Sequence, residues 1–230
     1  MTGSDYALRV GLIDTCRRLQ TSGLTVGTSG NVSVRRDDRS ILISPTGVAY
    51  DALTPEDVPV LAFDGRWWGR LKPSSEWRFH RDILRARTDS NAVVHTHSTH
   101  ATALACRGEG IPAFHYVVAI AGGADIRCAP YRTFGTQALS DAALAALDGR
   151  TACLLSNHGV IALGRDLIAA LNLAGEVENL ATQYLAATGP RPAQLLDAAE
   201  MARVLDKFRS YGRQDADDDP ELVFAGLVPP

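Results

Sequence analysis

Cysteine, lysine, long apolar runs and net charge are all scarce in this chain of 230 residues. Its four cysteines are widely spaced with no CxxC pair, which excludes a disulfide framework and indicates a reduced, cytoplasmic protein. Apolar stretches such as Tyr116–Ala121 are far shorter than the roughly 20 residues of a transmembrane helix, and we expect neither a membrane span nor a signal peptide. A formal net charge of -3 favours neither nucleic acid nor an anionic membrane as partner.

The composition predicts a sizeable buried core in a mixed α/β protein, because 46% of the residues are hydrophobic and strand-like runs alternate with helical patterns. We expect one catalytic domain over residues 1–214. Residues 215–230 begin with an acidic run that is too poor in apolar residues to pack, which predicts a mobile tail or one that docks on another subunit.

Apolar periodicity and turn residues predict the elements. We expect helices over 5–21, 73–87, 99–107, 136–147, 166–187 and 196–211. We expect strands over 32–35, 41–43, 58–63, 91–97 and 126–129, and a hairpin over 153–163.

Two histidines mark the end of one of these strands. The run from Asn91 to His95 is apolar and β-branched, and His97 follows two positions later. Side chains two apart on a strand point to the same side, about 7 Å apart at Cα, so both imidazoles can reach one ion. The pair therefore predicts a divalent metal site.

Two further residues are candidates for the same ion. His158 occupies the turn between two apolar runs, where a side chain is exposed at the tip, and Glu76 stands at a helix start after two hydroxyl residues. Imidazoles suit Zn²⁺ and its neighbours Mn²⁺ and Co²⁺, and an open coordination position is typical of a catalytic zinc site. Without a metal, His158 would only brace its turn and Glu76 would be an ordinary helix-start carboxylate.

Short hydroxyl-bearing and glycine-bearing loops accompany this constellation. Residues 27–31 and 44–47 combine glycines with side chains that form hydrogen bonds, and residues 74–75 add two hydroxyls beside free backbone N–H groups. Singly, each loop is more often a simple turn. Together they predict a phosphate site, whose candidates are Gly30, Asn31, Thr46, Gly47, Ser74 and Ser75.

Five ordered segments together resemble the class II aldolase and adducin family: residues 27–35, 43–47, 72–80, 93–97 and 157–159. The likeness extends from about residue 5 to 211 and takes in 115–116, 121–123 and 131–135. Within the family, the chain is most similar to the branch that cleaves L-fuculose 1-phosphate. Ser29, Thr96 and Asn157 depart from that branch, which questions the sugar more than the reaction.

The resemblance implies a three-layer α/β/α domain around a mostly antiparallel sheet, assembled as a homotetramer with sites between subunits. It implies one Zn²⁺ per subunit held by His95, His97 and His158, with Glu76 as resting ligand and acid/base. It also implies the six phosphate contacts named above. Tyr116 matches a tyrosine that reaches a neighbouring subunit's site as proton donor, and Tyr211 matches one on a segment covering the site.

The expected activity is reversible cleavage of a ketose 1-phosphate, such as L-fuculose 1-phosphate or a related deoxypentulose phosphate, to dihydroxyacetone phosphate and an aldehyde. The nearest alternative is an epimerase of the L-ribulose-5-phosphate 4-epimerase type, in which Asp replaces Glu76. Two other classes stay open: an imine-forming aldolase using Lys72, one of only two lysines, and a non-catalytic module like the adducin head domain.

Overall fold

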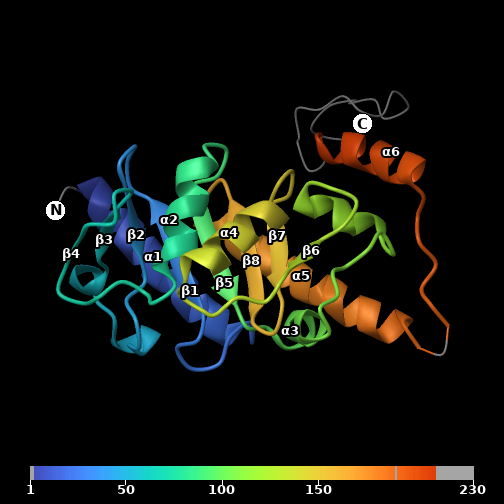
Figure 1. The fold of residues 1–230 in the computed structure, drawn as a ribbon. Helices are drawn as coiled ribbons and strands as arrows, with labels where there is room; N and C mark the ends of the chain where they lie inside the picture. The colour runs from blue at the N-terminus through green and yellow to red at the C-terminus, as the bar shows by residue number, and fades with distance from the viewer. Residues whose placement is uncertain (1–2, 190, 211–230) are drawn as a thin grey trace, which may run out of the picture.

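The computed structural model describes residues 3–189 and 191–210 (Figure 1). In these residues, eight strands form one sheet in the order β4-β3-β2-β1-β5-β8-β7-β6, and β6–β7 is its parallel pair. The strands are β1 (Asn31–Arg35), β2 (Ser40–Ile43), β3 (Val60–Ala62), β4 (Trp67–Trp68), β5 (Ala92–Thr96), β6 (Arg127–Ala129), β7 (Ala152–Leu155) and β8 (Gly159–Gly164). The expected mostly antiparallel sheet is confirmed.

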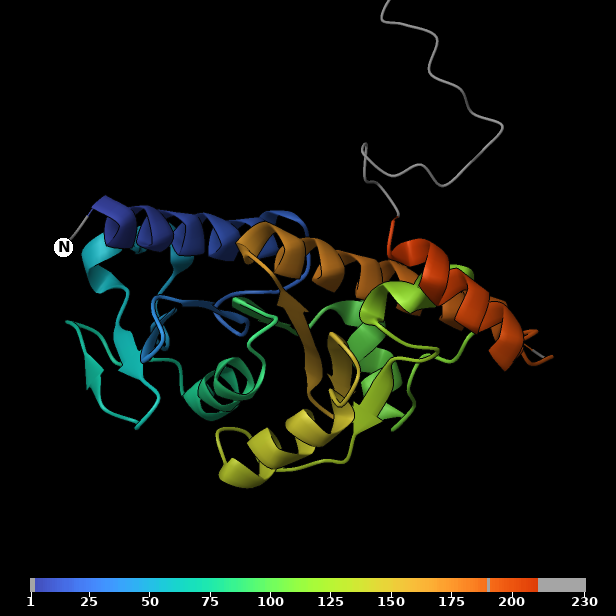
Figure 2. The ribbon, with the colours of Figure 1, turned by 90° about the horizontal axis from the view of Figure 1, so that it is seen from above.

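Helices cover both faces of this sheet, as Figure 2 shows from above. The helices are α1 (Gly3–Thr21), α2 (Trp77–Ala86), α3 (Thr99–Cys106), α4 (Gln137–Ala146), α5 (Leu167–Ala187) and α6 (Ala198–Phe208). Short 3₁₀ helices lie at η1 (Tyr50–Ala52), η2 (Pro55–Asp57) and η3 (Tyr116–Ala121). Helices α1, α3 and α5 pack on one face, and α2 and α4 pack on the other, which confirms the three layers.

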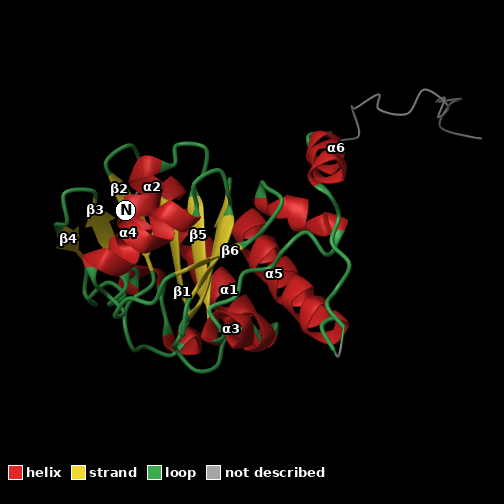
Figure 3. Cartoon of the chain, turned by 45° about the vertical axis from the view of Figure 1, so that its right-hand side comes forward, coloured by secondary structure: helices red, strands yellow, loops and turns green. Residues whose placement is uncertain are grey.

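The central strands carry apolar side chains on both faces, as expected for strands covered twice. In β5, Val94 packs in the core under α5, whereas Val93 faces the core under α2 and α4. The outermost helix, α6, packs against η3 and stands away from the sheet (Figure 3). All helices of the described residues are too short or too polar to act as membrane spans.

One predicted boundary is wrong in a way that bears on function. The helix expected from residue 73 begins at Trp77, with Glu76 at its N-cap. Residues 73 and 74 pair with the 44–47 loop instead: Pro73 forms a bridge with Pro45, and the Ser74 N–H donates to the Ser44 carbonyl over 3.0 Å. Residues 75 and 76 form the turn that leads into the helix. The pairing of residues 73 and 74 holds the 44–47 loop beside the helix start.

Candidate active site

The four residues predicted as metal ligands come from three segments that meet at one end of the central strands. His95 is in β5 and His97 directly follows it, while His158 lies in the turn between β7 and β8. Strand β8 pairs with β5, with Thr96 opposite Val160, so this turn lies beside the histidine pair. Glu76 approaches from the start of α2 on the same side.

The turn is shaped for this close approach. Asn157 has a left-handed backbone with φ 53°, a conformation that Asn adopts more readily than most residues. A Cβ added at Gly159 would lie 2.3 Å from the Thr96 carbonyl oxygen and 2.8 Å from the His97 ring. Because glycine has no Cβ, the turn that carries His158 can lie this close to β5 and its imidazole can reach the histidine pair.

The possible ligand atoms of these four residues all lie within 4.8 Å of one another. His95 Nε2 is 3.0 Å from His97 Nε2 and 3.2 Å from Glu76 Oε2. His158 Nε2 is 3.1 Å from Glu76 Oε1. Three imidazoles and a carboxylate therefore converge on one point, which is the donor set that Zn²⁺ and its first-row neighbours prefer.

Hydrogen bonding around the cluster supports a resident ion. The Nδ1 atom of His95 lies 2.8 Å from the Val160 carbonyl oxygen, which can only accept, so the proton sits on Nδ1 and the Nε2 lone pair faces the cluster. Glu76 Oε1 is buried without a hydrogen-bond partner of good geometry. A cation would bind both the His95 Nε2 lone pair and the Glu76 Oε1 atom, so the residues present fit a divalent metal.

The protonation of the cluster follows from its burial. Burial, followed by the nearby charges of His95 and His158, lowers the pKa of His97 to about 4, so this ring is neutral near pH 7 and able to ligate. Burial alone would raise the pKa of Glu76, but the electrostatic effect of the His95 and His158 rings beside it is larger and lowers the pKa. Its pKa therefore falls below the usual range and the group is a carboxylate.

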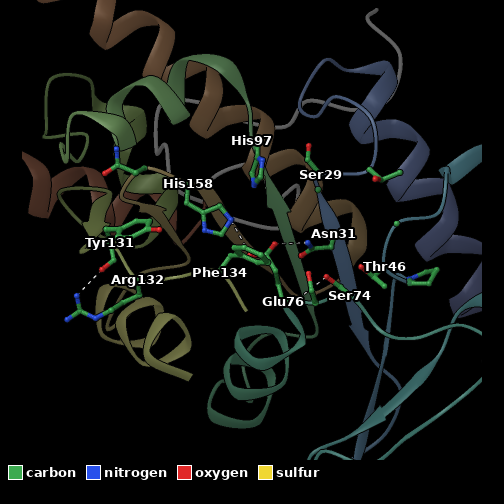
Figure 4. A pocket seen from close by; sticks show the side chains of 16 residues that line it. Ser29, Asn31, Thr46, Ser74, Glu76, His97, Tyr131, Arg132, Phe134 and His158 are labelled. Carbon is green, nitrogen blue, oxygen red and sulfur yellow. Dashed lines mark hydrogen bonds and ion pairs between the residues drawn. The ribbon is translucent and has the colours of Figure 1, made fainter. Parts of the chain in front are cut away.

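A cavity of about 330 Å³ opens beside this cluster, within the size range of small-ligand sites. Glu76, His97 and His158 line it (Figure 4). It also contains all six predicted phosphate contacts: Gly30, Asn31, Thr46, Gly47, Ser74 and Ser75. The structure therefore brings the candidate ion site and the candidate phosphate site into one space.

Backbone hydrogen bonds fix the loops that form the polar side of the cavity. The Thr46 N–H donates to the Lys72 carbonyl over 3.1 Å, which joins the 44–47 loop to the residues before α2. The Ser74 hydroxyl accepts from the Glu76 N–H over 3.2 Å. Gly47 has φ +69°, a left-handed backbone conformation that glycine adopts more readily than other residues. Hydroxyl-bearing residues thus line a space suited to an anion.

The other side of the cavity consists of aromatic and basic residues without a predicted role. Tyr131, Arg132 and Phe134 line it from the loop between β6 and α4, and Figure 4 shows Tyr131 and Arg132 across from Ser29 and Thr46. The loop is anchored on α2, because Arg78 donates to the Gly135 carbonyl over 2.6 Å. Tyr131, Arg132 and Phe134 lie in the 131–135 segment of the family resemblance, which is the sequence feature that could have indicated a role in the site.

Two other candidates, Tyr116 and Lys72, are not among the described residues that line this cavity. Tyr116 is 51% exposed at the start of η3, and its ring lies tilted beside that of Phe208 in α6, with ring centroids 6.5 Å apart. Tyr211 lies outside the described residues, as does the acidic 215–230 segment. Lys72 is exposed and is not among the residues that line the cavity, which speaks against an imine-forming nucleophile.

Comparison with known proteins places this site in a class. The sequence model of the class II aldolase and adducin N-terminal domain family matches residues 10–185, so the chain belongs to that family. It is 55% identical to the 5-methylthioribulose-1-phosphate/5-deoxyribulose-1-phosphate aldolase of Rhodospirillum rubrum, covering 92% of this chain and 96% of the relative.

Two further relatives are named for another sugar. The chain is 48% identical to the L-fuculose phosphate aldolase of Escherichia coli K12, over 87% of this chain and 94% of that protein. Among solved structures, an L-fuculose 1-phosphate aldolase superposes with a TM-score of 0.85 at 38% identity, covering 88% of this chain and 96% of the other. These relatives share an aldolase reaction but differ in the named substrate.

Proposed function

We propose that this protein is a zinc-dependent aldolase that reversibly cleaves a ketose 1-phosphate to dihydroxyacetone phosphate and an aldehyde. The observation that carries the proposal is the single cavity in which the His95, His97, His158 and Glu76 cluster opens beside the hydroxyl-lined loops. A phosphate seated in those loops places the first carbons of its sugar next to the cluster. That arrangement suits chemistry at a carbonyl close to a phosphate.

In this proposal, the three histidines hold the ion and Glu76 is its resting ligand. A divalent ion bound there supplies Lewis-acid polarisation of the ketose carbonyl. The phosphate contacts orient the substrate so that the bond between its carbons 3 and 4 lies at the cluster. Binding at two points, the phosphate and the carbonyl end, leaves the rest of the sugar directed toward Tyr131 and Phe134.

Proton transfer at two atoms completes the reaction. When the bond between carbons 3 and 4 breaks, its electron pair stays on carbon 3, and the Glu76 carboxylate takes up a proton from water and passes it to that carbon to give dihydroxyacetone phosphate. The hydroxyl on carbon 4 loses its proton as the aldehyde forms. In the reverse, bond-forming direction that oxygen takes a proton back, and we assign its donation to the Tyr116 hydroxyl of a neighbouring subunit; the phenolate left behind accepts the proton in cleavage. The Tyr116 side chain is half exposed, as a contact with another subunit requires.

The aldehyde half of the substrate is proposed from the relatives. Both L-fuculose 1-phosphate and the 5-deoxy or 5-methylthio pentulose 1-phosphates end in an apolar group, and the named relatives act on one or the other. The assembly implied is a homotetramer with sites between subunits, covered in part by Tyr211. A cytoplasmic location stays a prediction from the reduced cysteines.

Metal analysis combined with a screen of ketose 1-phosphates tests the function. We expect bound zinc, release of dihydroxyacetone phosphate from at least one of L-fuculose 1-phosphate, 5-deoxyribulose 1-phosphate and 5-methylthioribulose 1-phosphate, and loss of that activity with a chelator until zinc is returned. An epimerase would give a new sugar phosphate and no triose phosphate. Borohydride trapping of an adduct on Lys72, with indifference to chelation, would overturn the zinc mechanism.

A further inference from the structure

A line of buried polar side chains leads from the candidate active site into the core between β1 and α2. Asn31 Nδ2 donates to Glu76 Oε2 over 2.9 Å, and Asn31 Oδ1 lies 2.5 Å from His80 Nε2. The other ring nitrogen, His80 Nδ1, lies 2.7 Å from the Ser33 hydroxyl. His80 and Ser33 are fully buried, and Asn31 and Glu76 are each 5% exposed.

The spacing of these residues matches the periods of the two elements. Asn31 and Ser33 are two apart on β1, so their side chains leave the same face of the strand. Glu76 and His80 are four apart at the start of α2, about one helical turn. Two residues of a strand advance the chain by about 6.6 Å and four residues of a helix by about 6 Å, so the two pairs can lie side by side.

The direction of each hydrogen bond follows from the Glu76 end. A carboxylate only accepts, so Asn31 must turn its amide NH₂ toward Glu76 and its oxygen toward His80. The His80 Nε2 atom must then carry the proton, which leaves Nδ1 to accept from the Ser33 hydroxyl. Each of the four groups therefore has one defined orientation.

His80 is neutral in this buried position, so one of its ring nitrogens donates and the other accepts. Full burial, followed by the charge of His95, lowers the pKa of His80 to about 3. A neutral ring with its proton on Nε2 donates to Asn31 and cannot accept from it. While Glu76 is a carboxylate, the Asn31 amide therefore keeps its NH₂ toward Glu76 and its oxygen toward His80.

We propose that His80 is a positioning residue that holds the Glu76 carboxylate, through Asn31, in the orientation needed to bind the ion and to transfer a proton. The proton-transfer part rests on the proposed function, whereas the effect on metal binding does not. Second-layer hydrogen bonds of this kind typically change metal affinity by about 10- to 100-fold when removed.

Two substitutions of His80 by amide residues distinguish its hydrogen bond to Asn31 from its contribution to packing. Gln at position 80 can place its NH₂ near the position of the His80 Nε2 atom, whereas Asn is too short to reach Asn31. We expect His80→Gln to bind Co²⁺ within about threefold of the unsubstituted protein. We expect His80→Asn to bind it about tenfold more weakly and to lose kcat by a similar factor.

A double-mutant cycle with Asn31→Ala tests the route of the effect. Because His80 acts through Asn31, His80→Asn should add no further loss of Co²⁺ affinity once Asn31 is Ala. Ser140→Ala is the matched control: it removes a buried 2.7 Å hydrogen bond to Asp82 of the same helix, away from the cavity. It should lower the melting temperature and leave Co²⁺ affinity unchanged.

The inference is overturned if His80→Asn binds Co²⁺ as tightly as the unsubstituted protein, or if the losses of the two substitutions simply add. Equal losses in His80→Gln and His80→Asn would also overturn it, because they would reflect packing alone. If no ketose 1-phosphate is cleaved by the unsubstituted protein, the proposed function fails, and the Co²⁺ titrations still decide the role of His80.

Discussion

Replacing Glu76 by Gln removes one charge from the candidate active site while nearly keeping its shape. The carboxylate accepts from Asn31 over 2.9 Å at Oε2, and its Oε1 faces His158 Nε2 at 3.1 Å. A Gln in the same position must turn its oxygen toward Asn31. Its NH₂ then faces His158 and occupies the ring lone pair that a metal ion would use.

The expected cost has two parts. Occupying the His158 lone pair and losing a carboxylate ligand should weaken zinc binding by about 10- to 100-fold, so zinc present in excess can still be bound. Loss of the acid/base group should lower kcat by about 10²- to 10⁴-fold, even at saturating zinc. The circular dichroism spectrum should not change, because the fold keeps its packing.

Steady-state cleavage of the active ketose 1-phosphate, measured across zinc concentrations, separates these two parts. The control is Asp82→Asn, a charge loss at a buried carboxylate of the same helix whose partners are Arg81, Gln137 and Ser140. This variant should be less stable but retain kcat. Full turnover by zinc-loaded Glu76→Gln would refute the proton-transfer role.

The remaining predictions concern the other ligands, the loops and acid. His97→Ala should abolish zinc retention on gel filtration and turnover together, since it removes a ligand whose Nε2 lies 3.0 Å from that of His95; zinc retained at one equivalent would contradict it. Ser75→Ala should raise KM by about tenfold with little change in kcat, as loss of one hydrogen bond to a charged group costs roughly 1.5 kcal/mol; an unchanged KM would remove Ser75 from the phosphate site. Gly135→Ala should lower the melting temperature, because its φ is +72° and the new Cβ would lie 2.8 Å from the Ser75 carbonyl oxygen; calorimetry checks this, and no loss would show that the loop can move away. Metal-free protein should lose stability as pH falls from about 6.5 to 4, since the pKa values of His80 and His97 drop from 6.5 to about 3 and about 4 on folding and the unfolded chain binds the extra protons. Each histidine contributes at most about 1.4 kcal/mol per pH unit, and urea unfolding that is flat over this range would contradict the neutral burial.

Local patterns predicted the parts of the site that depend on neighbours along the chain. The alternation of a strand aligned His95 with His97, and that pattern needs only two residues. The glycine and hydroxyl loops were likewise visible as short segments. Bringing His158 and Glu76 to the same point required the pairing of β5 with β8 and the placement of α2, for which the family resemblance substituted.

Contacts between distant segments were beyond the sequence patterns. In the sequence, His80 is an isolated histidine with no pattern that indicates a role. Its hydrogen bond to Asn31 spans 49 positions and depends on how α2 packs on β1. The late start of α2 has the same origin, since Ser74 bonds to Ser44 in preference to beginning the helix. Tyr131 and Phe134 reach the cavity because Arg78 holds their loop, a contact over 57 positions.

The construction of the cavity from two separate walls has a practical consequence for engineering. The hydroxyl-bearing loops are held by hydrogen bonds to the residues before α2, and the imidazole cluster lies at the end of β5 and in the turn between β7 and β8. The aromatic wall belongs to the loop between β6 and α4, which Arg78 anchors on α2. Residues 131–134 can therefore be varied in a library without changing the proposed metal ligands or the loops proposed to bind the phosphate. Such a library would yield catalysts that join one invariant donor to many different acceptors.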